Sequence, residues 1–163
     1  MKFIIRSPLI ILFLILVSPV TADEYRGVVS KVVDGDTIDV KVDNKIIKRV
    51  RLRYIDAPEK NQSFGKEATS FLKKELLRKT VIVNTEYKGR YKRDIGDVFI
   101  YDDNIAIYIN AKLIKSGNAW VYKTYRKNTY LMNLENHARS NIIGLWKSSN
   151  PMKPWVFRQK NRE

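Results

Sequence analysis

The chain has 163 residues, with 31 lysines and arginines, 17 acidic residues and no cysteine, and its formal net charge at pH 7 is +14. This length allows one domain with a sizeable core, and the lack of cysteine excludes disulfides. The basic excess favours a polyanionic partner such as nucleic acid, although acidic lipid or a merely soluble cationic protein also fits the charge alone.

Residues 1–22 have the pattern of an export signal. Lys2 and Arg6 precede an apolar run over 9–17, and small residues precede Asp23. The run is shorter than the ~20 residues of a transmembrane helix, although an uncleaved membrane anchor is the alternative. We expect residues 23–163 to be secreted or periplasmic, with membrane contact only through the signal. Removing the signal lowers the net charge to +12, because it contains two basic and no acidic residues.

A strand followed by a hairpin is predicted for the next segment. Residues 25–33 favour a strand, residues 38–42 alternate between apolar and polar, and Asn44-Lys45 is a turn before a returning strand over 47–55. The hairpin would bring its two open ends close together.

Carboxylates lie at both open ends of this hairpin. The sequence Asp34-Gly35-Asp36 precedes it, and Asp56-Ala57-Pro58-Glu59 follows it. A positive φ at the glycine would aim the first two carboxylates at one point, and the proline fixes the second turn. Hard oxygen ligands without His or Cys suit Ca²⁺ or Mg²⁺. Arg49, Arg51 and Arg53 share one face of the returning strand, and a guanidinium beside such an ion suits a phosphate group.

The remaining elements follow from periodicity and turn signals. We expect helices over 63–79, 109–116 and 130–143, strands over 80–86 and 98–101, an aromatic extended segment over 118–125 and a basic tail over 148–163. The last helix should turn Ile142 inward, and Asp102-Asp103-Asn104 is read as a hairpin turn. The basic and aromatic loop over 87–94 could supply a phosphate-binding arginine and a ring for base stacking. The tail is expected to be a docked or loose basic arm.

Three motifs in this order, V-D-G-D-T, R-L-R-Y-I-D-A-P-E and Tyr91-Lys92-Arg93, resemble those of the staphylococcal nuclease family of Ca²⁺-dependent nucleases. The resemblance extends from Tyr25 to Trp146, with Lys92 in place of a family glycine. It implies that Asp36, Asp56 and the backbone carbonyl of Ala57 bind Ca²⁺. Asp34 would orient these ligands without contacting the ion. It also implies that Arg51, Glu59 and Arg93 are catalytic. Tyr91 and Tyr125 are expected to contact the substrate, with packing in the core as the alternative.

The element order fits an α+β protein, a five-stranded Greek-key barrel of the OB-fold type with about three packed helices. The OB assignment depends on the resemblance, which places the domain at 23–147 and the basic C-terminal tail at 148–163. The implied function is Ca²⁺-dependent hydrolysis of DNA and RNA with little sequence specificity, leaving 3′-phosphate ends. We expect a monomer without a stable protein partner.

Two other classes of protein remain open. A non-catalytic nucleic-acid-binding barrel explains the charge and the aromatic residues, but it does not require Arg51, Glu59 and Arg93 together. An exported basic protein acting on the envelope surface or a partner protein explains none of the carboxylates. An EF-hand is excluded, because Ile38 occupies the fifth position of the loop and Asp39 occupies its glycine position.

Overall fold

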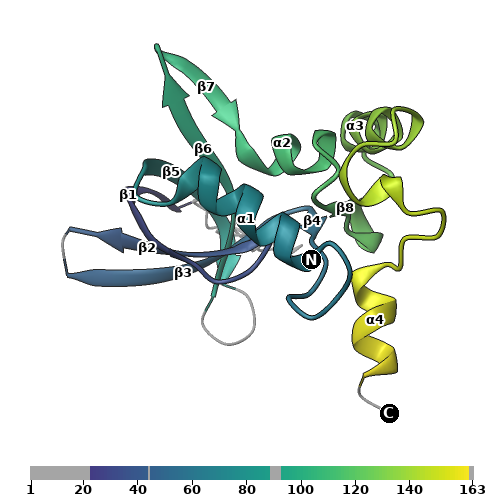
Figure 1. Cartoon of the computed structure of the whole chain (residues 1–163). Coiled ribbons are helices and arrows are strands. Elements are labelled where there is room, and N and C mark those ends of the chain that lie inside the picture. Colours follow the sequence, from purple (N-terminus) through teal and green to yellow (C-terminus); the bar gives the residue numbers. More distant parts are fainter. Residues whose placement is uncertain (1–22, 44, 89–92, 162–163) are drawn as a thin grey trace, which may run out of the picture.

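Five strands close into a barrel in the part of the chain that the computed structural model describes, residues 23–43, 45–88 and 93–161 (Figure 1). These strands are β1 (Asp23–Val32), β2 (Thr37–Val42), β3 (Ile46–Leu52), β5 (Thr80–Lys88) and β6 (Asp94–Asp102). Their order is β3-β2-β1-β5-β6, and a parallel pairing of β3 with β6 closes the ring. The predicted five-stranded OB-type barrel is therefore confirmed.

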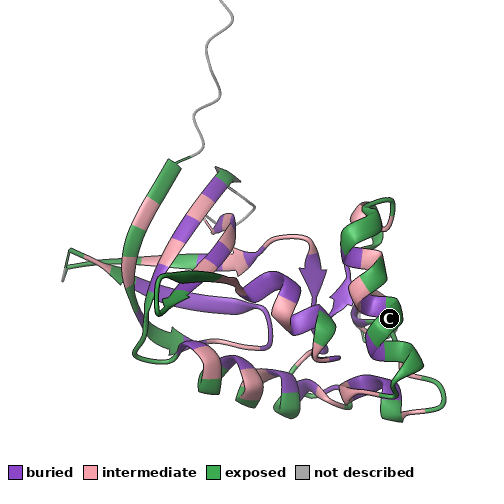
Figure 2. Cartoon of the chain, turned by 90° about the horizontal axis from the view of Figure 1, so that it is seen from above, coloured by how far each residue is buried: buried purple, intermediate pink, exposed green. Residues whose placement is uncertain are grey.

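The period-2 alternation of the strands fills the barrel interior. Ile38 and Val40 of β2 are fully buried, as are Val50 of β3 and Val98 of β6. Buried and intermediate residues alternate along most of β6, whereas β2 is buried at every position from Thr37 to Val40 (Figure 2). Burying such β-branched side chains on one face fixes the strand register, because a slip of one residue would expose all of them.

Four α-helices are present in the described part of the chain: α1 (Gly65–Leu76), α2 (Ile109–Lys115), α3 (Thr129–Ser140) and α4 (Pro154–Lys160). The first three correspond to predicted helices, whereas α4 lies in the predicted basic tail. Proline at its first position suits a helix N-terminus, because that residue needs no backbone N–H there. Among the described residues, no helix is both long and apolar enough to cross a membrane.

The predicted helix boundaries were too wide by two or three residues at three ends, and by one residue at the end of α2. Phe64 has a φ of 67° and Arg78 a φ of 65°, so the chain leaves helical geometry on both sides of α1. Helix α3 ends at Ser140, and Ile142 has a φ of 54° and is 62% exposed. The prediction that Ile142 turns inward was wrong, because the helix ends before its inward-facing position is reached.

Two turns shape the ends of the barrel. The predicted turn at 102–104 is confirmed between β6 and β7 (Ile105–Tyr108), with positive φ at Asp103 and Asn104. The predicted returning strand over 47–55 is instead interrupted by Tyr54, whose φ is 68°. The chain then forms the short strand β4 (Ile55–Asp56), which pairs with β8 (Trp120–Val121) outside the barrel.

Candidate active site

A cavity of about 530 Å³ opens beside the closing strands β3 and β6, and charged side chains of both signs line it. The acidic lining residues are Asp34, Asp36 and Glu59, and the basic ones are Arg51, Arg53, Arg93 and Arg158. Guanidinium groups beside carboxylates suit a phosphate group that is bound together with a hard cation.

The loop between β1 and β2 holds Asp36 in place through its own polar groups. The Asp36 backbone N–H donates to Asp34 Oδ1 at 3.1 Å, and the Thr37 hydroxyl donates to Asp36 Oδ1 at 3.0 Å. The expected positive φ at Gly35 is not found. Glycine is required for space instead, because a Cβ atom there would lie 2.6 Å from the Cβ of Ala57.

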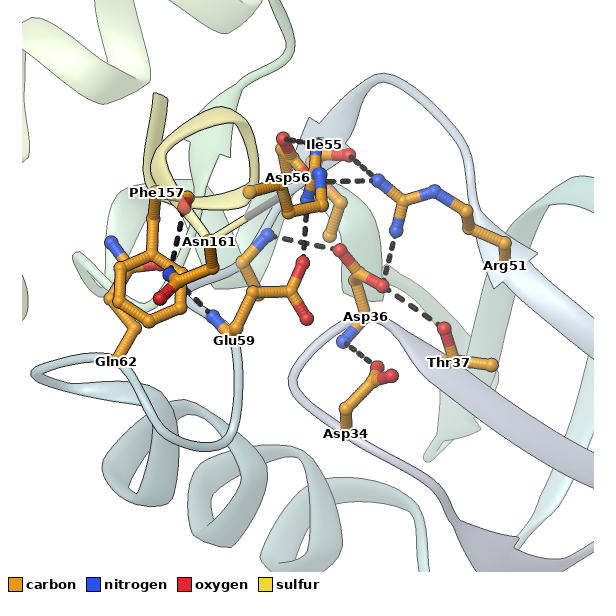
Figure 3. A network of polar contacts seen from close by, with 12 residues as sticks. Asp34, Asp36, Thr37, Arg51, Ile55, Asp56, Glu59, Gln62, Phe157 and Asn161 are labelled. Atoms are coloured by element: carbon orange, nitrogen blue, oxygen red, sulfur yellow. Dashed lines mark hydrogen bonds and ion pairs between the residues drawn. The ribbon is translucent and has the colours of Figure 1, made fainter. Parts of the chain in front are cut away.

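Arg51 joins the two predicted calcium ligands. Its Nη1 forms an ion pair with Asp36, and its Nη2 donates to Asp56 Oδ1 at 2.8 Å (Figure 3). The Ala57 backbone N–H donates to Asp36 Oδ2 at 3.0 Å. The register of β3 places Arg51 opposite both Thr37 of β2 and Ile95 of β6. One guanidinium therefore links the loops at the two ends of the hairpin, which lie close together as the hairpin pattern predicts.

Burial and the neighbouring charges act in opposite directions on these aspartates. Burial raises the pKa of Asp36, but Arg51, the Ala57 N–H and the Thr37 hydroxyl together bring it below its ordinary value. Burial raises the pKa of Asp56, and the adjacent arginines oppose that rise. Burial and the charge of Asp36 raise the pKa of Asp34 to about 6. Asp36 is therefore the carboxylate whose ionised form the protein favours most clearly.

Glu59 and Arg93 line the same cavity from different segments. Gln62 fixes the turn at Glu59. Its side-chain Oε1 accepts the Glu59 backbone N–H at 3.2 Å, and its backbone N–H donates to the Glu59 carbonyl at 2.8 Å. The Tyr25 hydroxyl donates to Asp94 Oδ2 at 2.9 Å and so fixes the start of β6 next to Arg93. The structure thus brings the predicted catalytic residues to one cavity.

Tyrosines form part of the cavity rim. Tyr125, the expected substrate contact, lines the cavity, and its ring lies edge-on to Tyr54 with centroids 4.7 Å apart. Tyr122 also lines it, although the sequence singled out no role for it. The signal that could have found it was the aromatic cluster over 118–125. The predicted substrate residue Tyr91 and the substituted Lys92 lie outside the described residues.

Arg158 of α4 is the charged cavity residue that the sequence reasoning missed. Its Nη2 donates to Asp56 Oδ2 at 2.7 Å, while Nη1 donates to Asp56 Oδ1 at 3.1 Å and to Glu59 Oε1 at 2.6 Å. Arg158 is 102 residues from Asp56 in sequence, so no local pattern indicates the contact. Proline followed by an apolar and aromatic run could have predicted the helix but not its position.

The donor chemistry of the site fits a hard divalent cation. Asp36, Asp56, Glu59 and the main chain at Ala57 offer only oxygen ligands, which Ca²⁺ prefers. Among the described residues, no group of three or more His, Cys or acidic side chains converges as a preformed metal centre. Two carboxylates, one carbonyl and water molecules are nevertheless a sufficient ligand set for Ca²⁺.

The fold and the cavity together define an OB-fold protein of the α+β class that gathers arginines and carboxylates beside its closing strands. The chain belongs to the family of staphylococcal nuclease homologues, whose model matches residues 49–148. The match covers Arg51, Asp56, Glu59 and Arg93, while Asp36 precedes it and Arg158 follows it.

Named relatives agree with this family. The chain is 38% identical over 142 residues to an "Uncharacterized endonuclease" of Escherichia coli O157:H7, covering 87% of this chain and 90% of the relative. It is 38% identical over 156 residues to a "Micrococcal nuclease" of Shigella flexneri, covering 91% and 88%. It is 35% identical over 167 residues to "Protein ParB" of Escherichia coli, covering 96% and 92%. The family and its nuclease-named members support a nuclease function.

Proposed function

We propose that the protein is a Ca²⁺-dependent endonuclease that hydrolyses DNA and RNA with little sequence specificity and leaves 3′-phosphate ends. The observation that carries this proposal is the bridge that Arg51 makes between Asp36 and Asp56, beside a cavity that also contains Glu59 and Arg93. Neither a structural ion pair nor a simple binding surface requires this combination.

The residues at this site have separate roles in hydrolysis. Bound by Asp36, Asp56 and the Ala57 carbonyl, Ca²⁺ would neutralise a phosphate oxygen and help to place the attacking water. Glu59 accepts a proton from that water as its oxygen bonds to phosphorus. The bond from phosphorus to the 5′ oxygen breaks, the 5′ oxygen takes a proton from solvent water and leaves as a hydroxyl, and the phosphate stays on the 3′ oxygen. Arg51 and Arg93 bind the remaining phosphate oxygens and stabilise the charge that grows in the transition state.

Substrate binding outside the scissile phosphate relies on charge and stacking. The net charge of +12 on residues 23–163 attracts the phosphate backbone, which carries no sequence information. The rings of Tyr122 and Tyr125 at the cavity rim offer stacking surfaces that accept every base. This combination explains why we propose low sequence specificity.

We also propose that the protein is exported and that it is a monomer. Residues 1–22, whose sequence predicts the export signal, lie outside the described residues. Their basic start, apolar run and small residues before Asp23 support secretion or release into a periplasm. Size-exclusion chromatography with light scattering would test the monomer, and N-terminal sequencing of the exported protein would test cleavage after residue 22.

The test of the proposed function is cleavage of heat-denatured DNA and of RNA with Ca²⁺ and with a calcium chelator. Arg51→Gln is compared with Arg49→Gln, because Arg49 lies on the same strand, pairs with Asp39 and does not line the cavity. We expect cleavage only with Ca²⁺, a loss of roughly 100-fold or more in kcat/KM for Arg51→Gln, and near wild-type activity for Arg49→Gln. Phosphatase treatment of the products should remove phosphate from 3′ ends.

Two results would overturn the proposal. The first is salt-sensitive nucleic-acid binding without cleavage, which would leave the non-catalytic barrel as the function. The second is cleavage by Arg51→Gln at the rate of Arg49→Gln, which would move the chemistry away from this cavity.

A further inference from the structure

Helix α4 contributes Arg158 to the lining of the cavity and lies beyond the residues that match the family model. Gln62 Nε2 donates to the Met152 carbonyl at 2.7 Å, just before the helix. Within the helix, the Trp155 ring lies edge-on to Trp120 and to Tyr122. The C-terminal segment is thus docked at the site and not a free basic arm.

Arg158 covers the buried carboxylate of Asp56. Its two terminal nitrogens bind both oxygens of that carboxylate as a fork, while Arg51 binds Oδ1 from the other side. Asp56 is consequently 0% exposed, although it is one of the two expected cation ligands. A carboxylate oxygen has about two lone-pair sites, so Oδ1 has none left for a further ligand.

The same guanidinium engages Glu59. Nη1 of Arg158 lies 2.6 Å from Glu59 Oε1, and the two side chains are about equally accessible, at 32% and 34%. One of the two Glu59 oxygens that could accept a proton from water is already bonded to Arg158. Arg158 therefore binds both Asp56, an expected ligand of the cation, and Glu59, the expected base.

We propose that α4 is an autoinhibitory latch, in which Arg158 and a divalent cation compete for Asp56 and Glu59. This inference rests on the proposed function, because it concerns the cation of the same site. A guanidinium and a divalent ion on one carboxylate repel each other and require the same lone pairs. Binding of the cation therefore requires Arg158 to leave, and Arg158 in place keeps the site inactive.

The attachment of α4 is weak enough to open. The helix has seven residues, and an isolated helix of this length is marginal in water. Pro154 is its only buried residue. The Arg158–Glu59 ion pair is about one third exposed on both sides, and such a pair contributes little to holding a segment in place. Local opening of such a segment costs far less than global unfolding.

Calcium binding measured by isothermal titration calorimetry tests the competition directly. The purified protein is compared with Arg158→Gln and with Lys160→Gln, a variant that removes the same charge from an exposed position of α4. A latch reduces the apparent affinity by the fraction of molecules that are open. We expect Arg158→Gln to bind Ca²⁺ on the order of tenfold more tightly, and Lys160→Gln to bind within about twofold of wild type.

A spin label reports the movement of the helix separately from affinity. The chain has no native cysteine, so Gln159→Cys on the exposed side of α4 provides a single labelling site. We expect Ca²⁺ to increase the mobility of this label in the otherwise wild-type chain. In the Arg158→Gln background, the label should be mobile before Ca²⁺ is added.

The outcomes separate the latch from the proposed function. Equal Ca²⁺ affinity in wild type and Arg158→Gln, with a label that does not respond, would overturn the latch and leave the nuclease proposal intact. Unchanged Ca²⁺ affinity with reduced cleavage would also overturn it and would make Arg158 a phosphate ligand. No Ca²⁺ binding by any variant would overturn the latch and the calcium requirement together.

Discussion

The main chain of Gly35 lies against the methyl group of Ala57, so that a Cβ atom at residue 35 would lie only 2.6 Å from the Cβ of Ala57. This contact fixes the distance between the loop that contains Asp36 and the turn that leads to Glu59. The hydrogen bond from the Ala57 N–H to Asp36 strengthens the same junction. The geometry of the site thus depends on glycine, which has no side chain, at residue 35 as well as on charged side chains.

Gly35→Ala should lower both stability and activity. The added methyl group overpacks a tight contact, which typically costs about 1–3 kcal/mol, and moves Asp36 away from Arg51. Thermal unfolding and kcat/KM on denatured DNA measure the two effects, with Ser63→Ala at an exposed position as the control. A variant with wild-type stability and activity would show that the loops are positioned in another way.

Asn110→Ala should be among the most destabilising single substitutions. The side chain of Asn110 is fully buried; its Oδ1 accepts the Val98 N–H at 3.0 Å, and its Nδ2 donates to the carbonyls of Arg53 and Gly96. Removing it takes this hydrogen-bond partner from the Val98 N–H and from the Arg53 carbonyl, at about 1–3 kcal/mol each, whereas the Gly96 carbonyl still accepts the Arg53 N–H. Urea unfolding should show a loss of at least about 2 kcal/mol, and the exposed Asn133→Ala should show almost none. Equal stability of the two variants would contradict this.

Tyr25 should make the protein sensitive to alkaline pH. Burial, followed by the hydrogen bond to Asp94, raises the pKa of Tyr25, and Asp23 adds to the effect, while Lys48 lies over the ring. Because the folded-state pKa is above that of the unfolded chain, stability is fully present below pH ~10 and is lost as the pH rises further.

Tyr25→Phe tests this dependence. Below pH ~10 the variant should be less stable by about 1 kcal/mol, because it lacks one hydrogen bond. Above that pH the difference should shrink, since the variant has no phenol to ionise at this position. Urea unfolding below and above pH ~10 measures this difference in stability, with Tyr130→Phe at an exposed position as the control. A difference that stays constant with pH would show that Tyr25 does not titrate as inferred.

Sequence patterns predicted the parts of the fold that depend on local periodicity. The alternation over 38–42 identified buried Ile38 and Val40, and the motifs placed Asp36 and Arg51 at the same site. The patterns did not show the turn at Tyr54, because a positive φ at a tyrosine is imposed by the pairing of β4 with β8.

Other features depended on contacts between distant segments. The sequence motif predicts a need for glycine at residue 35 because of its backbone freedom. The structure shows that glycine is needed there because Ala57 leaves no space for a side chain. Arg158 was grouped with a basic tail, because its contact with Asp56 arises only when α4 docks on Trp120 and Tyr122. Such contacts follow from tertiary packing and have no local sequence signature.

The central claim is that this cavity carries out hydrolysis, and Glu59→Gln tests it most directly. The variant keeps the shape of the side chain but removes the base. Single-turnover cleavage of a bound oligonucleotide in Ca²⁺ is measured together with binding affinity, with Glu67→Gln at an exposed position of α1 as the control. We expect Glu59→Gln to cleave roughly 100-fold more slowly or worse while its affinity for the oligonucleotide is retained. Cleavage by Glu59→Gln at the rate of Glu67→Gln would contradict the assignment of the active site.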